Sequence, residues 1–372
     1  MKKHALVDME KHFLRVIILN GLAPLAGERT IQALYYILRG RKANQTLQDI
    51  HLFRLHPYYR LFPGLSREDW EENVYFLHED GCIEVTRAAG PSPKPSFRLT
   101  ERGKEEQTHG CKQYQLERWL SPVSFSIHPE RFSLFWQRLH LIVQTVSQLL
   151  AGDIGFQPVV QNRQVQQWVK RVLASRDQRL LWQEGLHDEL LLLMNRLPQS
   201  VQEIVVRQFS GAAQAGLTET QMAREREQAP SYIHVQFRFA LATMIFLLEE
   251  EAPRFPLLSQ LIDAGSHKDL RLSESARQTY ALVQQRYTIE QIAAKRNIKP
   301  STVEDHLVEI ALHCPEWDAG EYVSETERQQ VAELSQQLGT SRLRLLKDAL
   351  GPAYSYLKIR LALALHKGRE AK

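Results

Sequence analysis

Phosphate binding is the chemistry that the charged side chains of this chain suit best, because its cations gather near the carboxyl end. After position 340 the acidic residues are Asp348 and Glu370 alone. Tyr354 and Tyr356 lie close to two of the cations, and aromatic rings interleaved with cations can stack on unpaired bases. A pair of core tyrosines on a solvated basic helix explains the same pattern. The candidate DNA contacts of this stretch are Arg342, Arg344, Lys358 and Arg360.

A second group of candidate phosphate ligands lies between positions 295 and 306. Lysine and arginine neutralise phosphates, while hydroxyl and imidazole groups can donate hydrogen bonds to them. Glu304, Asp305 and Glu309 lie among or just after these residues and would repel phosphate, so the sequence predicts only weak reading of base edges. The members of this group are Lys295, Arg296, Lys299, Ser301, Thr302 and His306.

A third basic cluster, Arg39, Arg41 and Lys42, precedes a predicted helix that Asn44 or Thr46 would cap. Three cations beside the free N–H groups of a helix start form a reasonable phosphate site. A solvated basic turn is an equally good interpretation.

The motifs that identify common enzymes do not occur in the sequence. It has no G-x-x-x-x-G-K-[ST] loop, which excludes an ATPase of the P-loop type, and no H-E-x-x-H or C-x-x-C. Cys82, Cys111 and Cys314 are too few and too far apart for a disulfide framework or a zinc site, and they suit a reducing compartment such as the cytoplasm. We therefore expect no enzymatic activity, no cofactor, no metal and no small-molecule substrate.

The element that positions the second cation group has the pattern of a helix–turn–helix, from Tyr287 to Leu312. Thr288 suits the N-cap of a first helix beginning at about Ile289. The small Ala293 would let a second helix cross closely, and Asn297 tolerates the left-handed conformation that ends a helix.

The second helix of this motif is expected to begin near Pro300, with Ser301 or Thr302 as its cap. A helical hairpin in a core is the alternative, but it would not require Ala293, Asn297 and Val303 at these offsets. The expected buried face is Val303, Leu307 and Ile310, and the expected outward positions are Ser301, Thr302, Glu304, Asp305 and His306.

Residues 1–110 are predicted to form a winged-helix-like module. Helical periodicity gives way to strand alternation at Cys82–Thr86 and Phe97–Leu99, on either side of a segment rich in Gly and Pro. Ser66 is expected to cap the helix before this wing and Thr100 the helix after it. The helix before the wing is strongly acidic, so we expect this module to dock a protein rather than to read a DNA groove.

Residues 111–265 are predicted to form a helical bundle, because they show helical periodicity and no strand pattern. Within them Thr218, Ala223 and Ser231 repeat the logic of cap, small crossing residue and second cap, which suggests a degenerate helix–turn–helix. A plain bundle is the alternative. The apolar run Phe239–Leu248 is half a bilayer span, so no membrane segment is expected.

Composition and charge are those of an ordinary globular protein. The chain has 372 residues, of which 43% are hydrophobic and 24% charged, and a net charge of +4 that is too weak by itself to argue for nucleic acid. Asp263–Leu272 is the best predicted linker and would separate a C-terminal helix–turn–helix domain over residues 266–372. The predicted fold is therefore mainly α, with a winged-helix-like module, a central helical bundle and a C-terminal helix–turn–helix domain.

The chain also resembles a known family. The resemblance is carried near the C-terminus by YTIEQIAAKRNIKPSTVEDHLVEIA, the Tyr322-Val323 step and AYSYLKIRLALAL. These are similar to the helicase helix–turn–helix domain at the end of some RecQ-type helicases, which also occurs in stand-alone YpbB-type proteins of Gram-positive bacteria. The segments IQALYYILRGRKANQTLQDIHLF, FRLTERG and FWQRLHLIVQ also look YpbB-like.

The resemblance implies a non-enzymatic partner that supplies DNA binding or regulation to a RecQ-type helicase. We therefore expect a cytoplasmic, nucleoid-associated accessory factor in DNA repair or recombination. It would bind DNA structure mainly through phosphates, while the winged helix and the bundle hold the helicase. A transcriptional regulator that reads an operator is the main alternative, and a scaffold that binds no DNA is another. Steep salt dependence with little sequence preference would distinguish the accessory factor from the regulator.

Overall fold

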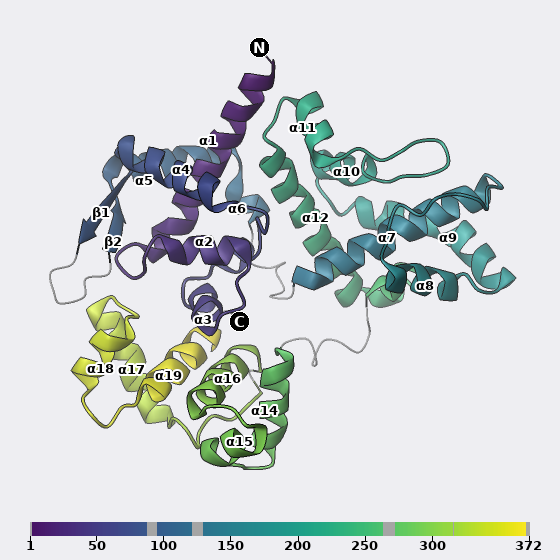
Figure 1. Cartoon of the computed structure of the whole chain (residues 1–372). Helices are drawn as coiled ribbons and strands as arrows, with labels where there is room; N and C mark the ends of the chain where they lie inside the picture. The colour runs from purple at the N-terminus through teal and green to yellow at the C-terminus, as the bar shows by residue number, and fades with distance from the viewer. Residues whose placement is uncertain (1, 88–94, 121–128, 263–271, 315, 370–372) are drawn as a thin grey trace. The chain divides into compact units, whose positions relative to one another are not determined.

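The computed structural model describes residues 2–87, 95–120, 129–262, 272–314 and 316–369 (Figure 1). These residues form helices and one antiparallel pair of strands, which confirms the mainly α fold class. The elements are α1 (Lys2–Leu22), η1 (Ala23–Leu25), α2 (Gln32–Arg39), α3 (Asn44–Leu52), η2 (His56–Tyr58), α4 (Arg67–Glu79), β1 (Ile83–Arg87), β2 (Pro95–Leu99), α5 (Glu101–Gln113), α6 (Leu116–Trp119), α7 (Pro129–Leu150), α8 (Arg163–Val172), α9 (Arg176–Met194), α10 (Gln199–Val206), α11 (Glu219–Arg226), α12 (Pro230–Glu250), η4 (Ala252–Arg254), η5 (Leu258–Leu261), α14 (Glu274–Gln284), α15 (Ile289–Arg296), α16 (Pro300–His313), α17 (Glu325–Leu338), α18 (Leu343–Leu350) and α19 (Tyr356–Arg369).

The chain divides into two compact units. The first unit comprises Met1–Ile17 and Gln107–Ala264, and the second comprises Ile18–Glu106 and Gly265–Lys372. The division points after residues 106 and 264 lie close to predicted domain boundaries, whereas the one after Ile17 falls inside the first predicted module. The second unit therefore combines most of the first predicted module with the last. The division into three domains stays a prediction, and nearly all of the predicted linker Asp263–Leu272 lies outside the described residues.

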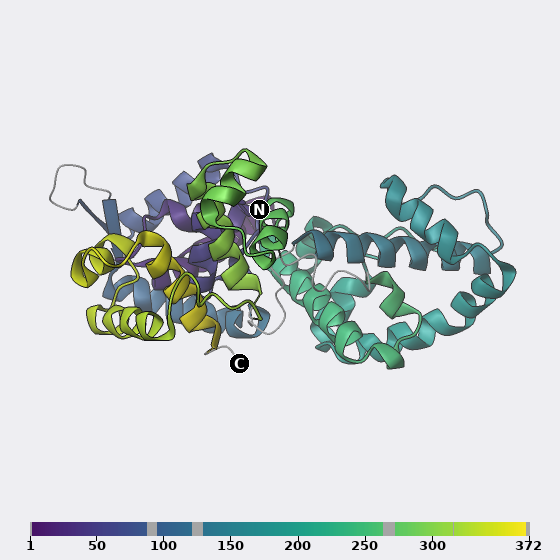
Figure 2. The same ribbon diagram turned by 90° about the horizontal axis from the view of Figure 1, so that it is seen from below.

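Helix α12 is the central element of the first unit, where it packs against α7, α9, α10 and α11. These helices are labelled in Figure 1, and Figure 2 shows the same unit, in teal and green, from below. It is long and apolar enough to cross a membrane by length and composition. However, 67% of its most apolar window is buried inside the protein, which is the pattern of a core helix. The apolar run Phe239–Leu248 lies within this helix.

The first part of the second unit has helices α2 to α4 followed by a hairpin, an arrangement consistent with a winged helix. Strands β1 and β2 pair with Ile83 opposite Leu99, and Ile83 and Phe97 are buried. The predicted caps are confirmed, because the Ser66 side chain accepts a hydrogen bond from the Asp69 N–H and Thr100 Oγ1 accepts one from Gly103. The Gly/Pro-rich connection, residues 88–94, lies outside the described residues.

The last helices of the second unit share their core with α3. Leu52 at the end of α3 belongs to the same buried cluster as Leu307 of α16 and Ile359 of α19, and α3 lies beside both helices (Figure 1). Histidines meet at this contact: His56 Nε2 lies 3.1 Å from His51 Nδ1, and the ring centroids of His51 and His313 are 5.0 Å apart.

Candidate nucleic-acid interface

The turn between α15 and α16 has the predicted helix–turn–helix geometry. Thr288 and Gln291 form a capping box, in which each side chain accepts a hydrogen bond from the other residue's backbone N–H at 3.3 and 2.9 Å. Asn297 ends α15 in the left-handed conformation, with φ of 53° and ψ of 47°. The start of α15 at Ile289 is also as predicted.

The predicted buried faces are confirmed as well. Ala293 is 5% exposed, and Val303, Leu307 and Ile310 are fully buried. Ile298, in the turn between the two helices, is half-buried and packs against the same core.

The start of α16 differs from the prediction. Pro300 occupies the first helical position, so the N-cap is Lys299, and no side chain caps this helix. The expectation that Ser301 or Thr302 would be the cap is therefore wrong. Instead, Ser301 is exposed and Thr302 is half-buried in the first turn, where their hydroxyl groups lie beside the free end of the helix.

Beyond Ser301 no residue of α16 is exposed. His306, expected to point outward, is only 6% exposed and its Nδ1 lies 2.8 Å from Thr279 Oγ1 on α14. Burial, and next the positive charge of Arg296, lowers the pKa of His306, so it is neutral at pH 7 and cannot serve as a cation for phosphate. The prediction failed because α14 covers this side of α16.

The acidic residues of α16 repel phosphate less than expected, because two of them are engaged inside the protein. Glu309 is buried, accepts hydrogen bonds from Ser273 N at 2.5 Å and Ser273 Oγ at 3.1 Å, and has its pKa raised by burial. Asp305 pairs with Arg360 at 2.7 Å. Glu304 is left as a half-buried carboxylate near the helix start.

Most of the candidate cations near the carboxyl end stabilise the fold instead of facing solvent. Arg360 is 14% exposed in its pair with Asp305, and Lys358 pairs with Glu327 at 2.6 Å. Both side chains therefore have internal carboxylate partners, and their contact with DNA stays a prediction. A sequence shows that the cations are clustered but not that carboxylates from α16 and α17 face them.

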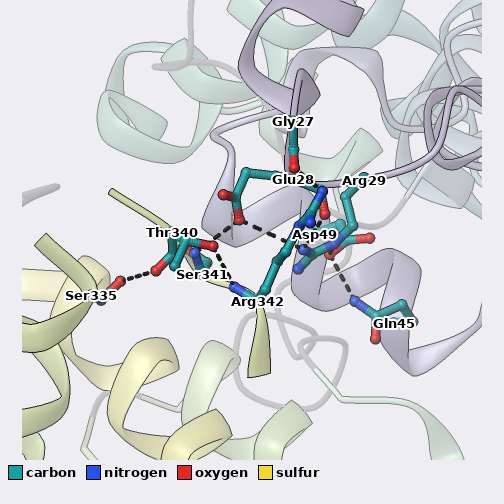
Figure 3. Close-up of polar contacts among 9 residues, drawn as sticks. All are labelled: Gly27, Glu28, Arg29, Gln45, Asp49, Ser335, Thr340, Ser341 and Arg342. Atoms are coloured by element: carbon teal, nitrogen blue, oxygen red, sulfur yellow. Dashed lines mark hydrogen bonds and ion pairs between the residues drawn. The ribbon is translucent and has the colours of Figure 1, made fainter. Parts of the chain in front are cut away.

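Arg342 is also engaged internally, as the N-cap residue of α18. Its guanidinium donates to the carbonyl oxygen of Gly27, and the neighbouring Ser341 N–H donates to Glu28 at 2.8 Å. Figure 3 shows these contacts, which join the segment after α1 to the start of α18 within the second unit. Arg344, in contrast, is 88% exposed, with Asp348 4.0 Å away.

The two tyrosines of this region have different environments. Tyr354 is buried and its hydroxyl donates to Gln330. It is therefore a core tyrosine rather than a platform for bases, whereas Tyr356 is 50% exposed.

The cations around the helix–turn–helix corner fall into two kinds. Arg296 holds α15 to α14, since it donates to Ser275 O at 2.7 Å and to Gln278 Oε1 at 3.1 Å. Lys295 is exposed, and its Nζ lies 4.4 Å from the centre of the Tyr287 ring. Lys299 is exposed and has no ion pair with any described residue. Of the candidate phosphate ligands of this corner, Lys295, Lys299 and Ser301 are therefore exposed and Thr302 is half-buried.

The third predicted cluster surrounds the start of α3. Arg39 donates to Leu65 O at 3.1 Å, Arg41 lies 4.5 Å from the centre of the Tyr36 ring, and Lys42 is exposed. The N-cap of α3 is Ala43, so the expected cap by Asn44 or Thr46 is wrong, and Thr46 is buried.

The first unit contains a second corner, between α11 and α12, that matches the α15–α16 corner residue for residue. Thr218 forms a capping box with Gln221, and Ala223 is fully buried. Glu227 takes the left-handed conformation, with φ of 51°, and Pro230 occupies the first position of α12. Ser231 was expected to cap α12, but the N-cap position is held by Ala229, so this expectation is wrong.

The start of α12 is occupied by a carboxylate of the same unit. Glu10 of α1 accepts hydrogen bonds from the N–H and the hydroxyl of Ser231, at 3.0 Å for the N–H. A helix start attracts anions, and Glu10 supplies one internally. Ser301, the counterpart of Ser231 on α16, is exposed. Of these two corners, only the one at α15 and α16 therefore leaves its helix start open to an external anion.

Comparison with known proteins agrees with this reading of the C-terminal region. Residues 275–363 match the family model of a helix-turn-helix domain. Over 357 residues the chain is 27% identical to Protein YpbB of Bacillus subtilis (strain 168), a match that covers 95% of this chain and 98% of that protein. No solved structure matches. The chain is thus similar to YpbB along almost its whole length and carries a C-terminal helix–turn–helix domain.

Proposed function

We propose that this chain is a non-enzymatic DNA-binding partner of a RecQ-type helicase, acting in DNA repair or recombination. The helix–turn–helix domain at residues 275–363 indicates DNA binding, and with the mainly helical fold it points to a non-catalytic protein. The helicase partnership is supported by the resemblance of Tyr287–Leu312 to the domain that ends some RecQ-type helicases. A protein of this kind would reside in the cytoplasm, associated with the nucleoid.

The observation that carries the DNA-binding mode is the exposure of α16. A helix that reads a major groove presents side chains to base edges, and its exposed face must be long enough to lie in the groove. After Ser301, the residues of α16 are buried or half-buried, and near its start only Thr302, Glu304 and Asp305 are half-buried, so its accessible face is short. Contact with phosphates through the open helix start, Lys295 and Lys299 is the mode that remains for this corner. This favours recognition of DNA structure over an operator sequence.

The DNA-binding part is tested with the full chain on forked and duplex DNA over a range of salt concentrations. Replacing both Lys295 and Lys299 by Gln should make the slope of log affinity against log salt less negative by about 2. Each lost phosphate contact reduces the magnitude of this slope by about 0.9. Replacing the exposed Arg67 and Arg102 by Gln is the matched control, because the change in net charge is the same. An unchanged slope for the lysine variant, or strong preference for one duplex sequence, would contradict this mode of binding.

The helicase part is tested by co-purification with a RecQ-type helicase and by unwinding rates with and without this chain. The acidic helix α4 is the proposed docking element. Its exposed carboxylates include Glu68 and Glu72. Replacing these two by Lys should weaken co-purification while DNA binding by the chain alone persists. Co-purification that is insensitive to this change would assign docking to another element.

A further inference from the structure

Helix α8 of the first unit presents a basic face to solvent. Its apolar side is anchored in the unit by Val165, Trp168 and Val169, all buried, and α8 packs against α7 (Figure 1). With about 100° per residue, the remaining positions form one continuous outer sector of the helix. The exposed residues of this sector are Arg163, Gln164, Gln167, Lys170 and Arg171.

Helix α8 itself carries no acidic residue, and the nearest ones along the chain are Asp153 and Asp177. Between positions 154 and 176 the sequence has no Asp or Glu, and Arg176 at the start of α9 adds another exposed cation. None of the four cations forms an ion pair with any residue that the structure describes. They differ in this respect from Lys358 and Arg360, each of which contacts a carboxylate.

Hydrogen bonds also hold both ends of helix α8. Arg179 of α9 donates to the carbonyl oxygens of Leu173 and Ala174 at 3.1 Å, which satisfies acceptors just beyond the last turn of α8. At the other end, Asn162 accepts a hydrogen bond from Gln164 N at 3.0 Å as the N-cap. The basic face therefore belongs to a helix whose two ends are both held by hydrogen bonds.

We infer that the outer face of α8 is a second DNA-contacting surface, which holds phosphates of the backbone. This inference rests on the proposed function and deepens it, because it adds a surface in the first unit to the helix start of α16. Arg163 and Lys170 are separated by about 10 Å along the helix, which matches about three nucleotides of one strand at about 3.4 Å each. The amides of Gln164 and Gln167 can donate hydrogen bonds to phosphate and sugar oxygens.

DNA fits this face better than an anionic membrane does. A helix that lies on a bilayer inserts an apolar face among the lipids, but the apolar face of α8 is buried in the protein. The face also lacks the exposed aromatic and aliphatic side chains of a protein-binding hot spot.

The test compares the full chain with the variant Arg163→Gln, Lys170→Gln and Arg171→Gln, using forked DNA over a range of salt concentrations. We expect the slope of log affinity against log salt to become less negative by about 2 to 3. The affinity at low salt should fall at least about tenfold. The control carries Arg67→Gln, Arg102→Gln and Lys112→Gln, an equal change in charge at other exposed sites, and should bind like the unmodified chain. Circular dichroism verifies that both variants are folded.

A parallel measurement with the Lys295 and Lys299 double variant separates this inference from the proposed function. Loss of affinity in both variants supports both surfaces. If only the α8 variant loses affinity for DNA, the α8 surface is supported and the helix start of α16 does not contact DNA. Wild-type binding by the α8 variant overturns the inference, whatever the double variant does. Tighter binding of the full chain to phosphatidylserine vesicles than to DNA, lost in the α8 variant, would also overturn it.

Discussion

Arg360 and Arg344 lie in the same basic stretch but in opposite environments, so they predict different responses to the same change. Arg360→Met should lower the free energy of unfolding by about 1 to 3 kcal/mol, because the half-buried Asp305 loses its partner. Arg344→Met should change it by less than about 0.5 kcal/mol, since this side chain is exposed. Urea denaturation followed by circular dichroism measures both values. Equal effects would show that the Arg360 pair does not stabilise the fold.

At this scale the sequence predicts where charges cluster but not which charges remain free. Lys358 and Arg360 are neighbours of Tyr356 in sequence, whereas their partners Glu327 and Asp305 lie on other helices. A pairing of this kind depends on the tertiary arrangement, which local spacing does not contain. Helix α8, which carries cations and no acidic residue, is not among the candidate sites expected from the sequence. The absence of Asp and Glu from residues 154–176 is a pattern that could have revealed it.

Among the elements, the corner between α15 and α16 depends on the left-handed residue that ends α15. Asn297→Ala should lower the free energy of unfolding by about 1 kcal/mol, because a Cβ without a compensating polar side chain is unfavourable at φ of 53°. Asn297→Gly should keep the stability within about 0.5 kcal/mol of the original, since glycine adopts this conformation freely. Thermal or urea unfolding of the two variants tests this. A larger loss for glycine than for alanine would be inconsistent with backbone strain as the cause.

The contact between α3 and α16 predicts a dependence of stability on pH. Burial lowers the pKa of His56 to about 4 from 6.5, and burial followed by the charges of His56 and His313 lowers the pKa of His51 well below its usual value. Between pH 6.5 and about 4, the unfolded chain binds protons at these histidines that the folded chain does not. The free energy of unfolding therefore falls as the pH falls through this window, by about 2 kcal/mol at pH 5 from His56 alone.

Unfolding in urea at pH 7 and pH 5 measures this difference. His56→Leu should reduce it, because the group that takes up the proton on unfolding is gone. His187→Gln is the control, since His187 is 80% exposed and its removal should leave the difference unchanged. A stability that rises on acidification would contradict the prediction.

The existence of elements could be predicted from sequence more completely than their environment. Caps such as Thr288, Ser66 and Thr100 involve residues a few positions apart, so local chemistry determines them. The outward face expected for α16 is partly covered, because α14 and α19 both pack on this helix. Proline displaced the predicted caps of α16 and α12 for a local reason, since it takes the first helical position and moves the cap to the residue before it.

For the whole molecule, the pairing of distant segments in the second unit predicts that a change in α3 affects the last helices. Leu52→Ala should lower the free energy of unfolding by about 2 to 4 kcal/mol, as for other large buried aliphatic residues. Hydrogen exchange followed by mass spectrometry should then show faster exchange in α16 and α19. The control Val85→Ala, at an exposed position of β1, should leave their exchange unchanged. Loss of protection limited to the first hundred residues would refute this coupling.

The three predicted domains and the two compact units group the segments of the chain differently. The division points after residues 106 and 264 lie within a few residues of the predicted boundaries at 110 and 265, whereas the one after Ile17 falls inside the first predicted module. The apolar side of α3 predicts only that something covers Leu52, and hydrophobicity does not specify whether the covering residues are near or far along the chain. Pairing of this kind is determined by shape complementarity in three dimensions.

The arrangement of the second unit also constrains how the protein is made. Its first segment leaves the ribosome before residues 107–264, and the helices that cover α3 are translated only after them. At about 5 to 20 residues per second, this interval lasts about 8 to 30 seconds. During this interval Leu52 and its apolar neighbours on α3 lack the helices that bury them in the folded protein. The nascent chain therefore exposes a defined apolar segment to which a chaperone can bind until synthesis is nearly complete.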